Sequence, residues 1–168
     1  MLANANTLNS TDNNQKEKIP LNLKAILISG FVAGIAICIG AIMMVAPIFS
    51  NEISIVLHHR NLPDLNAIAT VYFFGISFVF GIFLMFLYAA LRHRFGSKIK
   101  TAVIAALIVW VLAYLLNNIS LVVYGFMPIK LALLGIFWGL IGLLLAGVIG
   151  SRIYERHQKN NEDNEDND

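Results

Sequence analysis

Four long apolar blocks, separated by short polar segments, dominate the pattern of hydrophobic and polar positions along this chain. They cover residues 25–49, 67–91, 101–127 and 131–154. Each is longer than the roughly 20 helical residues needed to cross the hydrocarbon core of a bilayer. A surface helix of a soluble protein has a polar face, and these blocks have none. The pattern therefore predicts an all-α fold, a polytopic transmembrane four-helix bundle, whose short connections make consecutive helices antiparallel in an up-down arrangement.

Composition supports the same class of protein. Hydrophobic residues make up 58% of the 168 residues and charged residues only 13%, whereas soluble domains carry about 25% charged residues. The transmembrane domain is predicted to cover residues 24–156. The polar ends, residues 1–23 and the acidic segment 157–168, have too little apolar surface to offset their ordering entropy and are predicted to be disordered cytoplasmic tails. The first block is too long for a cleaved signal peptide, so we expect it to be retained.

The distribution of Lys and Arg predicts the orientation. Of the 12 such residues, only Arg60 and Lys130 fall on one side of the predicted membrane. The other ten are Lys16, Lys18, Lys24, Arg92, Arg94, Lys98, Lys100, Arg152, Arg156 and Lys159. Short cytoplasmic loops are enriched in these residues. The chain is therefore predicted to be a multi-pass protein of the cell membrane, with the bacterial inner membrane as the expected location and both termini in the cytoplasm.

Small residues at steps of three and four predict where the helices pack. Membrane helices associate by close backbone approach and interhelical hydrogen bonds, so small residues mark their contacts. The predicted packing seams contain Gly30, Gly34, Gly81, Gly135, Gly139, Gly142 and Ala146. The G-x-x-x-G pairs, Gly30 with Gly34 and Gly135 with Gly139, fit either a homodimer face or contacts within the bundle. In the third block the predicted stripe is Ala102, Ala106, Trp110, Ala113, Asn117, Ser120 and Tyr124.

A polar group interrupts the outer part of the third block. It consists of Tyr114, Asn117, Asn118 and Ser120. Asn117 is 17 residues after Lys100, or about 25 Å along a helix, which places it in the outer third of the bilayer. Tyr114, Asn117 and Asn118 are expected to share one helix face because they are three and four residues apart. The group predicts a small polar pocket open to the outer side, or alternatively interhelical hydrogen bonds or a break in the helix.

The inner loop between the second and third blocks is basic. Arg92, Arg94, Lys98 and Lys100 are candidates for contact with anionic lipid headgroups; alternatively, they only set the topology. Gly96 is expected to supply the tight turn.

In the outer loop, His58 and His59 lie between Glu52 and Asp64. Such residues can bind a metal, but adjacent histidines point in different directions on regular structure. We expect no metal site there, and we interpret Ile53–Leu57 as a short amphipathic turn.

The sequence lacks the patterns that indicate transport coupling or catalysis. No Asp, Glu, Lys or Arg lies deep in a block, which argues against ion-coupled transport. Nucleotide-binding, metalloprotease, nucleophile-elbow and nucleic-acid signatures are missing from the sequence. The single cysteine, Cys38, has no partner for a disulfide. We expect no cofactor, no enzymatic activity and no nucleic-acid partner.

Several short motifs carry a resemblance to a known group of proteins. They are Leu84–Gly96 followed by Lys100-Thr101-Ala102, then Val109-Trp110, Gly125-Phe126-Met127-Pro128 and Trp138-Gly139-Leu140. Over residues 30–154 the chain resembles a family of small bacterial four-span inner-membrane proteins to which no function is assigned. The resemblance implies a bacterial source and four spans, and it implies no chemistry.

Three classes of function remain open on this sequence. The favoured class is a non-enzymatic membrane component that binds a membrane-protein partner, lipid or itself as a homo-oligomer. The alternative is a small-solute permease or channel acting as an oligomer, which requires the Asn117 face to line a wet cavity. A membrane enzyme would require His58 or His59 to converge with a carboxylate.

Overall fold

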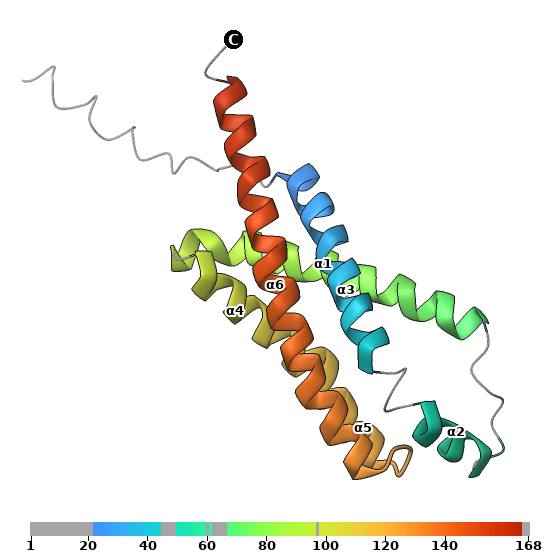
Figure 1. The fold of residues 1–168 in the computed structure, drawn as a ribbon. Coiled ribbons are helices and arrows are strands. Elements are labelled where there is room, and N and C mark those ends of the chain that lie inside the picture. The colour runs from blue at the N-terminus through green and yellow to red at the C-terminus, as the bar shows by residue number, and fades with distance from the viewer. Residues whose placement is uncertain (1–21, 45–49, 60, 62–66, 97, 166–168) are drawn as a thin grey trace, which may run out of the picture.

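The protein is built from four membrane-crossing helices. The structure, a computed structural model, describes residues 22–44, 50–59, 61, 67–96 and 98–165. Within these ranges, four helices are long and apolar enough to cross a membrane. They are α1 (Leu23–Met44), α3 (Ala67–Phe95), the continuous span of α4 (Lys98–Trp110), η2 (Val111–Leu115) and α5 (Leu116–Val123), and α6 (Ile129–Glu165) (Figure 1). The all-α four-helix fold of a multi-pass membrane protein is thereby confirmed.

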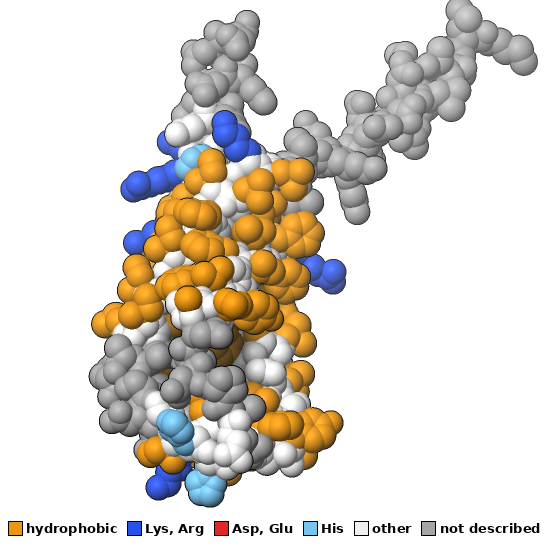
Figure 2. Space-filling model, turned by 90° about the vertical axis from the view of Figure 1, so that its right-hand side faces the viewer, with side chains coloured by type: hydrophobic (Ala, Val, Ile, Leu, Met, Phe, Trp, Pro, Cys, Tyr) orange, Lys and Arg blue, Asp and Glu red, His pale blue; other side chains and the backbone are white. Residues whose placement is uncertain are grey.

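The four spans pack as a ring. α1 contacts both α3 and α6, and α4 contacts the same two helices. In Figure 1, α1 and α6 run in opposite directions and α3 crosses them steeply. The start of α1, the α3–α4 turn and the end of α6 lie toward one end of the bundle, which we call the inner end because the bias of Lys and Arg predicts that it faces the cytoplasm. Hydrophobic side chains cover a broad area of the surface in Figure 2, where a bilayer would surround the protein.

Local sequence signals fix several helix ends. The side chain of Asn22 caps α1 by accepting a hydrogen bond from the Ala25 amide at 3.1 Å. Gly96, with a φ of 64°, ends α3 and confirms the predicted tight turn. Gly125, with a φ of 70°, ends α5. The Phe126 amide returns to the Leu121 carbonyl at 2.7 Å, which is the Schellman arrangement that stops a helix.

Three elements differ from the prediction. The third span was predicted to continue to residue 127, but its helix ends at Val123 because Gly125 stops it. Residues 50–59, expected to be loop with a short amphipathic turn, form a complete helix, α2 (Ser50–His59). The last helix continues to Glu165, whereas residues 157–168 were predicted to be disordered. The Gln158 side chain of this extension accepts a hydrogen bond from Arg92 on α3, which favours its helical form. The predicted disorder of residues 1–21 lies outside the described part of the chain.

Glycine residues allow α1 and α3 to approach each other closely. A methyl group built on Gly30 would lie 2.6 Å from the Ile82 Cα, and one on Gly34 would lie 2.9 Å from the Phe78 Cα. One on Gly81 would collide with the backbone of both α1 glycines. This first G-x-x-x-G pair is therefore used inside the bundle.

Two glycines of α6 also lie at contacts between helices of the bundle. The ring of Tyr114 occupies the space where Gly139 would carry a side chain, and Gly135 faces the Asn118 amide oxygen. Ala146 is fully buried in the core. Gly142 has no neighbouring atom within 4 Å of a built methyl group, so this seam residue lines open space instead of a helix contact.

Replacing Gly81 by alanine should destabilise the bundle, because the new methyl group forces α1 and α3 apart. Overpacking of this kind costs about 1–3 kcal/mol. Unfolding of the purified protein in mixed micelles with increasing SDS measures the effect.

Gly75→Ala is the matched control on the same helix. A methyl group at Gly75 meets no atom within 4 Å. This variant should keep or slightly raise stability, by up to about 1 kcal/mol, because alanine favours helix over glycine. Equal effects of the two substitutions would contradict the close contact.

Candidate functional site

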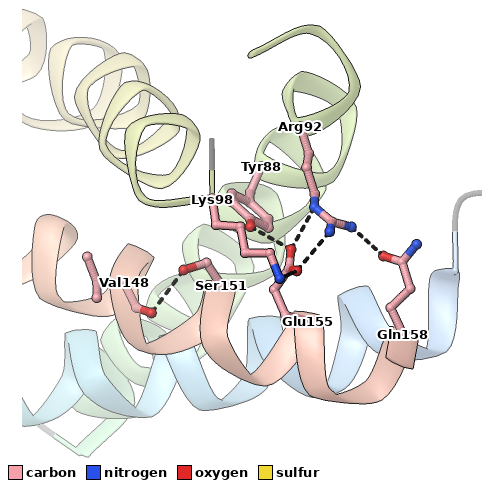
Figure 3. A network of polar contacts seen from close by, with 7 residues as sticks. All are labelled: Tyr88, Arg92, Lys98, Val148, Ser151, Glu155 and Gln158. Carbon is pink, nitrogen blue, oxygen red and sulfur yellow. Dashed lines mark hydrogen bonds and ion pairs between the residues drawn. The ribbon is translucent and has the colours of Figure 1, made fainter. Parts of the chain in front are cut away.

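A single carboxylate organises the inner end of the bundle. The Oε1 atom of Glu155, on α6, accepts a hydrogen bond from the Tyr88 hydroxyl at 2.9 Å. The Arg92 guanidinium binds both carboxylate oxygens, with Nε 2.6 Å from Oε1 and Nη2 2.8 Å from Oε2. Lys98 places its Nζ 2.6 Å from Oε2 (Figure 3). Each oxygen of Glu155 therefore has two donors, and the two-pronged Arg92 contact fixes the geometry.

Three helices supply this cluster, which consists of Tyr88, Arg92, Lys98, Glu155 and Gln158. Tyr88 and Arg92 lie one turn apart on α3, and Lys98 is the first residue of α4. Arg92 also donates from Nη1 to the Gln158 side-chain oxygen at 2.7 Å. The cluster thus ties the α3–α4 turn to the extension of α6.

A buried aromatic pair lies close to Glu155. The rings of Tyr88 and Tyr154 meet edge to face, with centroids 5.7 Å apart, and both residues are almost fully buried. The Tyr88 hydroxyl needs a hydrogen-bond partner in this apolar surrounding, and Glu155 provides it. Glu155 itself keeps 13% of its side chain exposed. The cluster therefore sits where the apolar core of the bundle gives way to the charged inner end.

A hollow of about 420 Å³ opens beside this cluster. It is lined by Arg92, Lys98, Glu155, Arg156, Gln158 and Lys159. Four cationic side chains thus face one carboxylate. Arg156 and Lys159 are exposed and form no ion pair with any side chain that the structure describes. The hollow is therefore suited to an anionic group.

The structure divides the four predicted headgroup residues into two pairs. Arg92 and Lys98 line the hollow, whereas Arg94 and Lys100 are exposed and do not. Sequence patterns alone did not identify Glu155, Gln158 and Tyr88 as members of a site, and Arg156 and Lys159 entered only as topology signals. No sequence signal identified this cluster, because Glu155 is paired with Arg92 and Lys98 from other helices and lies beyond the last apolar block.

The predicted outer polar pocket is only partly assembled. A cavity of about 190 Å³ lies among α1, α3, α5 and α6, and Tyr114 and Asn118 line it together with Gly135, Gly139 and Gly142. The Asn118 side chain donates to the Tyr114 carbonyl at 2.7 Å. Asn117 faces a separate groove, and Ser120 is exposed and donates to the Leu116 carbonyl at 2.9 Å.

The π-helical turn explains this division. Residues 111–115 form a wider turn than an α-helix, so one more residue fits before the same face returns. The stripe that begins with Ala102 and Ala106 was expected to continue to Asn117. The extra residue brings Asn118 to the inward position, where it is buried, and turns Asn117 outward.

The two tryptophans carry hydrogen bonds between helices. Trp110 donates to the Ile136 carbonyl at 2.8 Å, and Trp138 donates to the Gly40 carbonyl at 2.7 Å. These bonds tie α4 to α6 and α6 to α1.

The outer histidines lie in the last turn of α2. The side chain of Glu52 and all of Asp64, the proposed carboxylate neighbours, fall outside the described part of the chain. Within that part, no group of three or more His, Cys, Asp or Glu side chains is placed to hold a metal ion.

Glu155→Gln should weaken the bundle, because the change removes the charge that Arg92 and Tyr88 share. Hydrogen bonds to charged groups contribute about 1.5–3 kcal/mol, so we expect a loss of about 2 kcal/mol in the free energy of unfolding. Lys98→Gln is the control, since 64% of the Lys98 side chain is exposed and exposed pairs contribute at most about 1 kcal/mol. SDS-driven unfolding of both variants measures the difference. A larger effect of Lys98→Gln would contradict the central place of Glu155.

Comparison of the chain with models of protein families, with curated proteins and with solved structures finds no match. The resemblance to bacterial four-span proteins therefore stays a prediction. The role of the protein has to be inferred from the arrangement of its own side chains.

Proposed function

We propose that the protein is a non-enzymatic inner-membrane component that binds an anionic lipid headgroup in the hollow at its inner end. The observation that carries the proposal is the gathering of Arg92, Lys98, Arg156 and Lys159 around one carboxylate. Basic pockets between membrane helices on the cytoplasmic side are a recurrent form of headgroup site. Both termini then lie in the cytoplasm, as the bias of Lys and Arg predicts.

Two of the four cations are paired with Glu155 and two are not, and this difference supports binding over catalysis. Glu155 is saturated by four donors, so its charge is engaged in holding Arg92 and Lys98 in place. Arg156 and Lys159 form no ion pair with a described side chain and are available for a phosphate. In this proposal the carboxylate positions the site and the two exposed cations attract the ligand.

Neutralising the hollow should weaken the binding of phosphatidylglycerol. Each basic residue near an anionic membrane contributes about 1 kcal/mol, so the double variant Arg156→Gln/Lys159→Gln should bind roughly 30-fold more weakly. Native mass spectrometry of the detergent-purified full chain, titrated with phosphatidylglycerol or phosphatidylcholine, measures the bound lipid.

The double variant Arg94→Gln/Lys100→Gln is the matched control. It changes the net charge equally at the same end of the protein, but both residues lie outside the hollow. Its affinity for phosphatidylglycerol should stay within about twofold of the wild type, because its cations do not line the site. Equal losses in the two double variants would indicate a general surface attraction and would contradict a defined site. Equal binding of phosphatidylcholine by the wild type would contradict it as well.

A further inference from the structure

Polar side chains within the described parts of the four spans mostly have hydrogen bonds of their own. Ser29, Ser77, Ser120 and Ser151 each donate to a backbone carbonyl of their own helix. Trp110 and Trp138 donate to neighbouring helices, and Asn118 donates to the Tyr114 carbonyl. This pattern is expected because lipid tails offer polar groups no alternative partner.

Asn117 departs from this pattern. Its side chain is exposed on the outer surface of the bundle and makes no hydrogen bond to a residue that the structure describes. It lies six residues before the end of α5, or about 9 Å along the helix. A lipid-facing amide at this depth lacks partners and therefore favours contact with another polar group.

The surroundings of Asn117 form a groove between α3 and the α4–α5 span. The groove has a volume of about 520 Å³ and is lined by Tyr72, Ile76, Phe80, Phe83, Val109, Leu112, Ala113 and Asn117. Ala113 lies one turn before Asn117, and its small side chain allows a second helix to come close. Leu112, which is 57% exposed, stands on the rim as a projecting apolar side chain.

The Asn117 amide is self-complementary, which favours a second copy of this chain as the occupant of the groove. A side-chain amide is both donor and acceptor, so two Asn117 side chains related by a two-fold axis can donate to each other. In such a contact the same patch serves both partners, and Leu112 of each copy can enter the groove of the other. The two glycine pairs that the sequence offered as dimer faces are occupied inside the bundle, whereas the amide of Asn117 has no partner among the described residues.

We propose that the groove around Asn117 is the contact face of a homodimer in which the Asn117 amides of two copies hydrogen-bond to each other. The proposal does not depend on the headgroup site, which lies at the opposite end of the bundle and uses other residues.

Cysteine crosslinking in native membranes tests this face directly. Cys38 is the only cysteine of the chain and is buried, so a Cys38→Ala background removes it. Ala113→Cys and Ser120→Cys then flank Asn117 by one turn on either side and leave the amide intact. Both variants should form covalent dimers on mild oxidation, and adding Asn117→Leu should reduce the yield at least fivefold. Asn117→Gln, which keeps the amide, should retain more crosslinking than Asn117→Leu.

Phe137→Cys is the control for random collision. Phe137 is 64% exposed on α6 and lies outside the groove, so it should crosslink weakly. Dimers at Phe137 as abundant as at Ala113, or crosslinking that Asn117→Leu leaves unchanged, would overturn the proposal. So would light scattering that shows a monomer of the Cys38→Ala protein in mild detergent together with no crosslinking at either flanking position.

Discussion

Because lipid tails are as apolar as leucine, α1 and α3 gain little from hiding hydrophobic surface and instead approach each other backbone to backbone. Gly30 and Gly34 on α1 meet Gly81 on α3 with no room for a methyl group at any of the three positions. This contact fixes the relation of the first two spans. α6 then packs against both, with Gly150 close to the Met85 side chain of α3. Large apolar side chains such as Phe137 are left facing outward, as a protein dissolved in a bilayer requires.

Close approach alone does not hold the ends of the helices, and polar contacts take over there. At the inner end, Glu155 joins α6 to α3 and to the start of α4. In the outer half, Trp138 joins α6 to α1. Each of these bonds joins two helices. Apolar side chains lack directional contacts, so these bonds specify how the helices are placed relative to one another. The candidate headgroup site lies at the inner end for the same reason. Charged side chains are tolerated there, and the ion pairs of Glu155 hold the helices together.

Much of the fold could be predicted from the sequence, because the constraint imposed by the bilayer acts on composition. The four spans follow from block length, and the turn at Gly96 follows from its glycine. The turn at Gly125 was not predicted, because this residue lies inside the apolar block 101–127. The extent of α6 could not be predicted in this way, since the extension is held by the bond between Gln158 and Arg92 on another span. The burial of Asn118 in place of Asn117 depends on a π turn, which has no simple sequence signal. The site at Glu155 was missed because residues beyond the last apolar block were considered only as topology signals.

In the proposed site, the cations of the hollow bind a lipid phosphate. Solid-state NMR on protein with ¹³C-labelled arginine Cζ in phosphatidylglycerol bilayers can measure the ³¹P–¹³C dipolar coupling between arginines and headgroups. We predict a short-range coupling that falls selectively in Arg156→Gln and persists in Arg94→Gln. A coupling that is lost equally in both variants, or that is missing from the wild-type protein, would contradict a headgroup site at the inner end.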